Sequence, residues 1–317
     1  MSNILVTGAT GKTGSYTIPL LLEKGHHVRA LVRQIDARSK ELEKLGVEIA
    51  VGDYLDFDSV VSALRGINRA YFCYPIRVGI IQATGYFAQA ARENGVEAIV
   101  NMSQISSRRE AKSNAARDHF IAEQVFDWSG VPTTHLKPTF FAEWLLNQSS
   151  NIASGKLILP YKGKHAPIAA EDQAHVIANI LDKPEGHGGK VYPLYGPENL
   201  TMNEVAEELT EALGHSVSYQ YVPFDAFYNG LRDRMSDKGE HNQTNLYGAL
   251  ENSPQGRVAF DFLGQHLREV SEDHDNGVFA GTNDVVQKIG GIPGTTVKAY
   301  ALKHKDQFKS SALSSQK

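Results

Sequence analysis

Three glycines spaced three apart, Gly8, Gly11 and Gly14, are the first residues in the chain whose type and spacing could do chemistry. They follow an apolar segment, Ile4–Val6, and precede an amphipathic stretch, Tyr16–Leu22. A strand, a tight turn and a helix in that order offer backbone N–H groups and the positive end of a helix dipole to a phosphate. Gly8 permits the sharp turn, Gly11 lets the backbone reach a pyrophosphate, and Gly14 lets the helix pack on the strand. An ordinary turn is the alternative, but this context is what a dinucleotide motif requires. The expected cofactor contacts in this turn also include Thr10, Lys12 and Thr13.

The residue that ends the second predicted strand indicates which dinucleotide to expect. That strand, His27–Val32, is followed by Arg33, whereas NAD calls for a carboxylate there to accept from the ribose hydroxyls. A guanidinium suits a 2′-phosphate, and Lys12 could add a second positive charge. Asp36 is the contrary observation, but it lies three residues further on and is expected to open the next helix. NADP is therefore favoured over NAD, the alternative for Arg33 being an exposed arginine at a strand end.

Polar and aromatic residues close the later strands, where ligands of parallel sheets bind. After the third strand, Asp53 is expected to accept from the adenine amine and Tyr54 to flank the ring, although Asp53 could instead cap a turn. Tyr74 ends the fourth strand and is counted among the cofactor contacts. Ser103 ends the fifth strand beside the expected nicotinamide and could bind cofactor or substrate, or cap the following loop. Pro138 is expected to border the nicotinamide face.

An aromatic segment follows the sixth strand. Phe140, Phe141 and Trp144 would form a wall suited to a flat apolar substrate. Packing of a helix start into the core is the alternative. No pair of histidines has metal-ligand spacing with cysteines or carboxylates nearby, so no metal site is expected.

Strands and helices must alternate to position these residues. The expected strands are Asn3–Thr7, His27–Val32, Val47–Val51, Arg69–Tyr74, Ala98–Met102, Thr133–Leu136 and Lys190–Tyr195, with helices between them at Asp58–Leu64, Ile80–Glu93 and Arg117–Trp128. Such alternation predicts an α/β fold with a doubly wound parallel sheet and a smaller α+β C-terminal substrate lobe. We expect a nucleotide-binding region at 1–150, a lobe at 151–309 that completes the sheet and cleft, and a disordered tail at 310–317.

Later elements are expected within that lobe. A capping box of Thr201 and Glu204 should open a helix that ends at Gly214. A strand at Val217–Val222, helices near Phe224–Met235 and Gln243–Leu250, and a mobile polar loop at Asp233–Gln243 should follow.

Bulk composition narrows the classes of partner. The 317 residues carry a formal net charge of -4, which argues against a nucleic-acid partner bound through phosphates. The single cysteine, Cys73, fits a reducing compartment. No apolar run is long enough to cross a bilayer, and a core strand begins where a signal peptide would stand. A cytoplasmic protein is expected, with a homodimer left open.

Several segments together resemble the NmrA-like family of atypical short-chain dehydrogenase/reductases. They are Val6–Gly14, Leu31–Arg33, Gly52–Asp53, Leu136–Phe141 and the closing segment Gly281–Pro293. The resemblance covers nearly the whole chain. It implies a Rossmann fold that binds NAD(P), and activities that range from NADPH-dependent reduction of quinones and dyes to NAD(P)-binding regulation without turnover.

The superfamily's usual catalytic pair is missing. A tyrosine proton donor followed four residues later by lysine is expected, yet none of the 13 tyrosines has lysine at that place. The corresponding helix carries Ser113 and Arg117 instead. Related reductases show Lys, then His, then Glu, and Arg117, His119 and Glu123 match that frame with arginine replacing lysine. Arg117 is expected to bind the ribose, and His119 could donate a proton near neutral pH or be a satisfied surface histidine.

These observations predict an NADPH-dependent oxidoreductase that reduces a quinone-like or conjugated aromatic acceptor. The alternative is an NAD(P)-sensing regulator with little or no turnover. An isomerase or dehydratase with bound NADP is least supported, because the Tyr-Lys pair is absent.

Overall fold

Parallel strands form the centre of the molecule. The computed structural model describes residues 1–237 and 254–309. Seven strands pair in the order β3-β2-β1-β4-β5-β6-β8, every neighbouring pair parallel. Their bounds are β1 Asn3–Val6, β2 His27–Val32, β3 Glu48–Val51, β4 Arg69–Cys73, β5 Ala98–Met102, β6 Thr133–Pro138 and β8 Val191–Leu194. The chain runs outward from β1 to β3 and then crosses to β4, so the order reverses between β1 and β4. The predicted doubly wound sheet is confirmed, with the late strand β8 at its edge.

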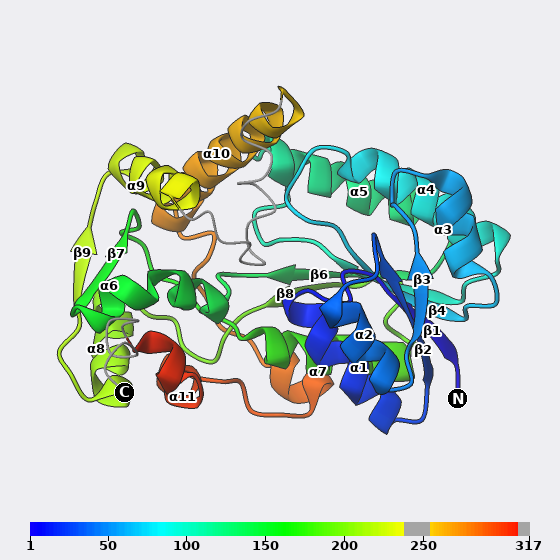
Figure 1. The fold of residues 1–317 in the computed structure, drawn as a ribbon, viewed down its shortest axis with the longest axis horizontal. Helices are drawn as coiled ribbons and strands as arrows, with labels where there is room; N and C mark the ends of the chain where they lie inside the picture. The colour runs from blue at the N-terminus through cyan, green and yellow to red at the C-terminus, as the bar shows by residue number, and fades with distance from the viewer. Residues whose placement is uncertain (238–253, 310–317) are drawn as a thin grey trace.

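Helices cover both faces of this sheet (Figure 1). On one face, α1 (Lys12–Glu23), α2 (Ala37–Lys44) and α7 (Ala170–Asp182) contribute Ile18, Leu42 and Ile177 to one apolar core. On the other, α3 (Phe57–Leu64), α4 (Ile80–Glu93) and α5 (Asn114–Ser129) contribute Leu64, Phe87 and Phe126 to a second core. Because both faces are buried, the central strands β1, β4 and β5 are mainly apolar along their length instead of alternating between apolar and polar residues. This burial explains why their positions could be predicted closely.

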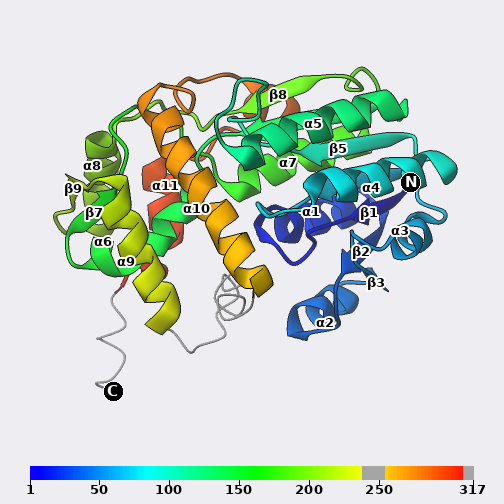
Figure 2. The same cartoon turned by 90° about the horizontal axis from the view of Figure 1, so that it is seen from above.

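A smaller lobe lies beyond the carboxyl ends of the strands (Figure 2). It contains η1 (Ala142–Gln148), α6 (Ser149–Ala153), β7 (Lys156–Leu159), α8 (Met202–Leu213), β9 (Ser218–Tyr221), α9 (Phe224–Asp237), α10 (Pro254–Asp275), α11 (Val297–Lys303) and η4 (Lys305–Phe308). By contrast, η3 (Val286–Gly290) packs against α7 and joins the core on one face of the main sheet. β7 and β9 form a separate parallel pair. The capping box of Thr201 and Glu204 and the end of α8 at Gly214 are confirmed. The sequence did not predict β7 or α10.

Part of the predicted polar loop is helical. Residues 233–237 belong to α9, so the loop prediction is wrong there. The remainder of that loop, the helix expected at Gln243–Leu250 and the tail at 310–317 lie outside the described residues.

Polar contacts join α10 to the segment between β5 and α5. Arg108 donates through Nη1 to Oδ2 of Asp273 at 2.9 Å, and Lys112 forms an ion pair with Glu272 at 2.9 Å. Ser113, which caps α5, is hydrogen-bonded through Oγ to Nδ1 of His266 at 2.8 Å. The lobe is thereby held against the carboxyl end of β5. In residues 1–237 and 254–309, no helix is both long and apolar enough to cross a membrane.

Candidate functional site

The glycine turn has the geometry that its sequence predicts. Gly8 has φ of +59°, in the left-handed region that favours glycine, and the N–H of Gly11 donates to the Gly8 carbonyl at 2.8 Å. A Cβ at Gly14 would lie 2.4 Å from that same carbonyl oxygen, so only glycine lets α1 approach this closely. A Cβ at Gly11 would lie 3.0 Å from it. The turn is therefore tightly packed against the start of α1.

The start of α1 offers hydrogen-bond donors to an anion. Gly11 is the N-cap and supplies no side chain to satisfy the first N–H groups of the helix. Lys12 is exposed, Thr10 is half-buried, and Thr13 is buried with its hydroxyl 2.7 Å from that of Tyr71. This arrangement suits a pyrophosphate, with Lys12 free to add charge.

The aromatic residues near the turn are parts of the core rather than exposed platforms. Tyr54 is buried, accepts from the Gly8 N–H at 3.1 Å and donates to the Cys73 carbonyl at 3.0 Å. Its ring packs edge-on against Phe72 and Tyr74. The expectation that Tyr54 flanks an adenine is wrong, because the phenol supports the glycine turn from behind.

Tyr74 is similarly occupied. It is buried, and its hydroxyl donates to the Val78 carbonyl at 3.1 Å and accepts from Arg77 at 3.2 Å. It therefore shapes the loop after β4, in place of the expected direct cofactor contact. Asp53 remains exposed, with one carboxylate oxygen accepting from the Leu55 N–H at 2.9 Å.

The charges after β2 favour a phosphate over a free ribose. Asp36 caps α2, accepting from the N–H groups of Arg38 and Ser39, as expected from its position. Hydrogen bonds from the Arg38 side chain, then from the Ser39 backbone, lower the pKa of Asp36. Its carboxylate is thereby engaged within its own helix. Arg33 is exposed at the end of β2, so it is the charge that a ligand would meet there.

A buried polar cluster joins the ends of β5 and β6 to α5. Lys137 on β6 forms an ion pair with Glu123 of α5, with Nζ 2.9 Å from Oε2. The other carboxylate oxygen, Oε1, accepts from the Ser103 hydroxyl and, at 2.7 Å, from the Ser107 hydroxyl. The Ser103 hydroxyl therefore donates its hydrogen to Glu123, so toward any other group it can act only as an acceptor.

Sequence reasoning overlooked Lys137, although a signal for it existed. His135 and Lys137 alternate along β6 and so share one face of the strand, while Glu123 and Asp127 are four apart on α5 and share one face of the helix. The structure pairs them, Lys137 with Glu123 and His135 with Asp127 at 3.1 Å. Two basic residues two apart on a strand and two acidic residues four apart on a helix can form two pairs at once. This spacing indicates that the strand and the helix are in contact.

Arg117, His119 and Glu123 lie on α5, but the environment of His119 differs from the one that the sequence predicts. Arg117 is exposed and donates through Nε to the Ala111 carbonyl at 3.0 Å. His119 is buried, and burial above all, followed by the nearby charges of His266 and Lys137, lowers its pKa to about 3. The expectation that His119 is a surface group or titrates near neutral pH is wrong, since its imidazole is neutral at pH 7.

The predicted aromatic wall is divided between two environments. Phe140 is buried and packs edge-on against Tyr161, His165 and His274 in the lobe core. It therefore belongs to the core instead of an open wall. Phe141 is half-buried, and the Trp144 side chain is 42% exposed. Pro138 is buried, and its carbonyl accepts from Ile105 at 3.0 Å.

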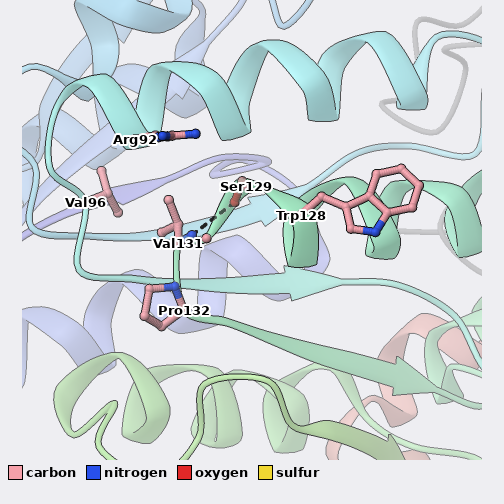
Figure 3. A pocket seen from close by; sticks show the side chains of 7 residues that line it. Arg92, Val96, Trp128, Ser129, Val131 and Pro132 are labelled. Carbon is pink, nitrogen blue, oxygen red and sulfur yellow. Dashed lines mark hydrogen bonds between the residues drawn. The ribbon is translucent and has the colours of Figure 1, made fainter.

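A hollow lies at the end of the sheet away from the glycine turn (Figure 3). Arg92, Val96, Trp128, Val131 and Pro132 line it together with Ser129 and Gly130. These residues precede β5 and β6 or end the helices before them, so the hollow lies at the amino ends of the strands. It is therefore separate from the glycine turn. No group of three or more His, Cys, Asp or Glu suited to a metal ion occurs among the residues the structure describes.

The doubly wound sheet and the glycine turn together define a dinucleotide-binding α/β protein. Comparisons with known proteins make this more specific. A sequence model of the NmrA-like family matches residues 1–253, and the chain belongs to that family.

Relatives with established names span most of the chain. It is 29% identical over 307 residues to NAD(P)H azoreductase of Xenophilus azovorans, covering 96% of this chain and 99% of that protein. It is 30% identical over 235 residues to quinone oxidoreductase 2 of Escherichia coli, covering 72% and 81%.

Solved structures show the same fold. The NADPH-dependent quinone oxidoreductase of Escherichia coli, in a complex with NADPH, superposes with a TM-score of 0.77 and 26% identity, covering 95% of this chain and 99% of that one. The triphenylmethane reductase of Citrobacter sp. has a TM-score of 0.75 at 24% identity, covering 95% and 99%.

Proposed function

We propose that this protein is an NADPH-dependent oxidoreductase that reduces quinone-like or other conjugated aromatic acceptors. The observation that carries the proposal is the glycine turn after β1, with an exposed Arg33 after the neighbouring strand β2. The chain's relatives include an NAD(P)H azoreductase and a quinone oxidoreductase. Arg33 can hold a 2′-phosphate through charged hydrogen bonds. The pyrophosphate would lie on the N–H groups at the start of α1.

The remaining residues would orient the nucleotide and the acceptor. NADPH supplies a hydride when bound. Arg117 retains free guanidinium N–H groups beyond its bond to Ala111 and could donate to the ribose. Ser103 offers an oxygen acceptor at the end of β5. Phe141 and Trp144 leave the carboxyl end of β6 with ring surface still exposed, which suits a flat acceptor.

We propose that the two parts of the chain have different roles. Residues 1–150 would bind the nucleotide, and residues 151–309 would complete the sheet and close the acceptor side. We also propose a cytoplasmic homodimer. Exposed apolar side chains on α5, Ile121 and Trp128, support an association surface, which analytical ultracentrifugation would test.

One observation favours a second candidate function, an NAD(P)-sensing regulator. Among the described residues of the helix frame, neither Arg117 nor the neutral His119 is an acid at pH 7. A sensor would bind NADPH without oxidising it.

Single-turnover and steady-state assays of NADPH oxidation separate these candidates. A panel of quinones, azo compounds and cationic dyes should include acceptors that the wild type reduces. Arg117→Ala should weaken NADPH binding and slow turnover together, whereas Trp144→Ala should raise the acceptor KM with NADPH affinity nearly unchanged. Tight NADPH binding with no oxidation across the panel would reject the reductase and leave the sensor.

A further inference from the structure

A buried carboxyl group stands in the segment that leads from β6 into the lobe. Glu143 lies in η1, between Phe141 and Trp144, and is 6% exposed. Its Oε1 accepts from the N–H of Ala170, the first residue of α7, at 3.0 Å. Its Oε2 has no partner among the residues described. A buried polar atom without a partner is uncommon and calls for a ligand, a water or a proton.

The groups around Glu143 come from three helices and place it between the glycine turn and the lobe. Lys12 and Tyr16 face it from α1, Asp172 from α7 and Tyr300 from α11. Burial raises the pKa of Glu143, and the Asp172 charge adds to this, while the backbone N–H groups of Ala170 and of Glu143 itself, and then Lys12, oppose it. The Glu143 carboxyl group therefore keeps its proton to a higher pH than a glutamate side chain in water does.

Tyr300 adds a second unsatisfied atom to this neighbourhood. It is 2% exposed, and its hydroxyl has no partner within the described part of the chain. Burial first, and then the charges of Glu143 and Tyr16, raise its pKa. Tyr300 therefore stays protonated throughout the neutral range, and the carboxyl groups of this neighbourhood are Glu143 and Asp172. Asp172 already accepts from the Thr295 N–H and hydroxyl, whereas Oε2 of Glu143 has no partner among the residues described.

Three groups that the sequence placed near the nicotinamide do not fill this role, and the Lys137 ammonium is paired with Glu123. His119 is neutral, Arg117 keeps a fixed charge, and Ser103 already donates to Glu123. Reduction of a neutral acceptor nevertheless requires a proton as well as a hydride. The chain must supply it from a carboxyl group or leave it to solvent.

We propose that Glu143 is the proton donor for neutral acceptors, an inference that rests on the proposed reductase function. The hydride carries two electrons to the quinone as the O–H bond of Glu143 breaks and a new O–H bond forms at the quinone oxygen that becomes anionic. The two transfers occur in one step and give the hydroquinone, so loss of the proton donor slows hydride transfer as well. Water then returns a proton to the Glu143 carboxylate, so one NADPH and one proton are consumed for each quinone.

This assignment makes the need for Glu143 depend on acceptor charge. A cationic triphenylmethane dye becomes neutral on receiving a hydride and takes up no proton. Its reduction should be indifferent to Glu143, whereas a quinone should depend on it.

Glu143→Gln tests this difference, because the amide oxygen can still accept from Ala170 but the side chain cannot act as an acid. Glu171→Gln is the matched control: it makes the same substitution in the first turn of α7, at a carboxylate paired with Lys303. Single-turnover rates would be measured by stopped flow with NADPH bound and excess acceptor. Thermal unfolding of each variant would confirm that both fold.

Glu143→Gln should slow quinone reduction about a hundredfold, abolish its decline at high pH and leave dye reduction within about twofold of wild type. Glu171→Gln should change neither rate by more than about twofold. An unchanged quinone rate, or equal loss with quinone and dye, would overturn the proposal.

A second measurement does not depend on turnover. Infrared difference spectra of wild type against Glu143→Gln, with NADP⁺ present at pH 7, should show the carbonyl stretch of a protonated carboxyl. Absence of that band would overturn the assignment. If no acceptor is reduced by the wild type, the reductase function fails, and the proton-donor role falls with it while the band can still be present.

Discussion

The ion pair between Glu123 and Lys137 offers a stability test that follows directly from burial. The Lys137 side chain is 15% exposed and that of Glu123 is 5% exposed. Glu123→Gln removes the negative charge and leaves the ammonium group enclosed beside a neutral amide. Lys137→Met leaves the carboxylate, but the hydroxyls of Ser103 and Ser107 still donate to it.

The size of the effect differs between the two partners. Leaving one member of a buried pair uncompensated costs about 3–5 kcal/mol, and Glu123→Gln should fall in this range. Lys137→Met should cost less, about 2 kcal/mol, because the retained hydrogen bonds to a charged group each contribute about 1.5–3 kcal/mol. The double variant should lie within about 1 kcal/mol of wild type, since apolar or neutral replacement of a whole pair is often nearly neutral.

Urea unfolding monitored by circular dichroism would give the free energies of the four proteins at pH 7. The double-mutant cycle then isolates the interaction between the two side chains. A double variant whose free energy of unfolding falls by the sum of the two single-variant losses would refute the reasoning. The reasoning would also be refuted if Glu123→Gln cost less than about 1 kcal/mol, the value typical of an exposed pair.

Three further outcomes follow from the site. Arg33→Asp should reduce the preference for NADPH over NADH by about tenfold to a hundredfold, the worth of a charged bidentate contact; calorimetry showing equal affinities in the wild type would contradict it. Gly14→Ala should abolish soluble expression or destabilise the protein markedly, because its Cβ would lie 2.4 Å from the Gly8 oxygen; a wild-type melting curve would refute the close packing. Burial lowers the pKa of His119 to about 3 and that of His266 to about 4. Between these values and about 6.5 the unfolded chain binds more protons, so the free energy of unfolding should fall as the pH drops from 7 to 4. His119→Gln should make that decline shallower in urea titrations, and an identical slope would show that His119 titrates normally.

Local sequence was sufficient wherever a residue's role depends on its own backbone or its near neighbours. The left-handed Gly8, the Asp36 cap of α2 and the capping box at Thr201 follow from conformational freedom and from short-range hydrogen bonds. The strand positions followed as well, because a sheet buried on both faces requires continuous apolar runs.

The sequence was a poorer guide to side chains whose role depends on the element packed against them. Tyr54 was expected to meet a ligand, but its hydroxyl spans from Gly8 to Cys73, residues that belong to two different strand ends. His119 was expected to titrate near pH 7, but α10 and β6 enclose it near His266 and Lys137. A side chain's burial is set by segments distant in sequence, which no local pattern specifies.

Residue types and their spacing were enough to specify the strand–turn–helix unit, the order of strands and helices in the first half of the chain, and the positive charge at Arg33. Those features arise from backbone conformation, apolar periodicity and residue type. The packing of distant segments sets which polar groups are paired: Lys137 pairs with Glu123, whereas one carboxylate oxygen of Glu143 has no partner in the described part of the chain. The protonation state of a group depends on its desolvation and its neighbouring charges, and both are properties of the packed fold.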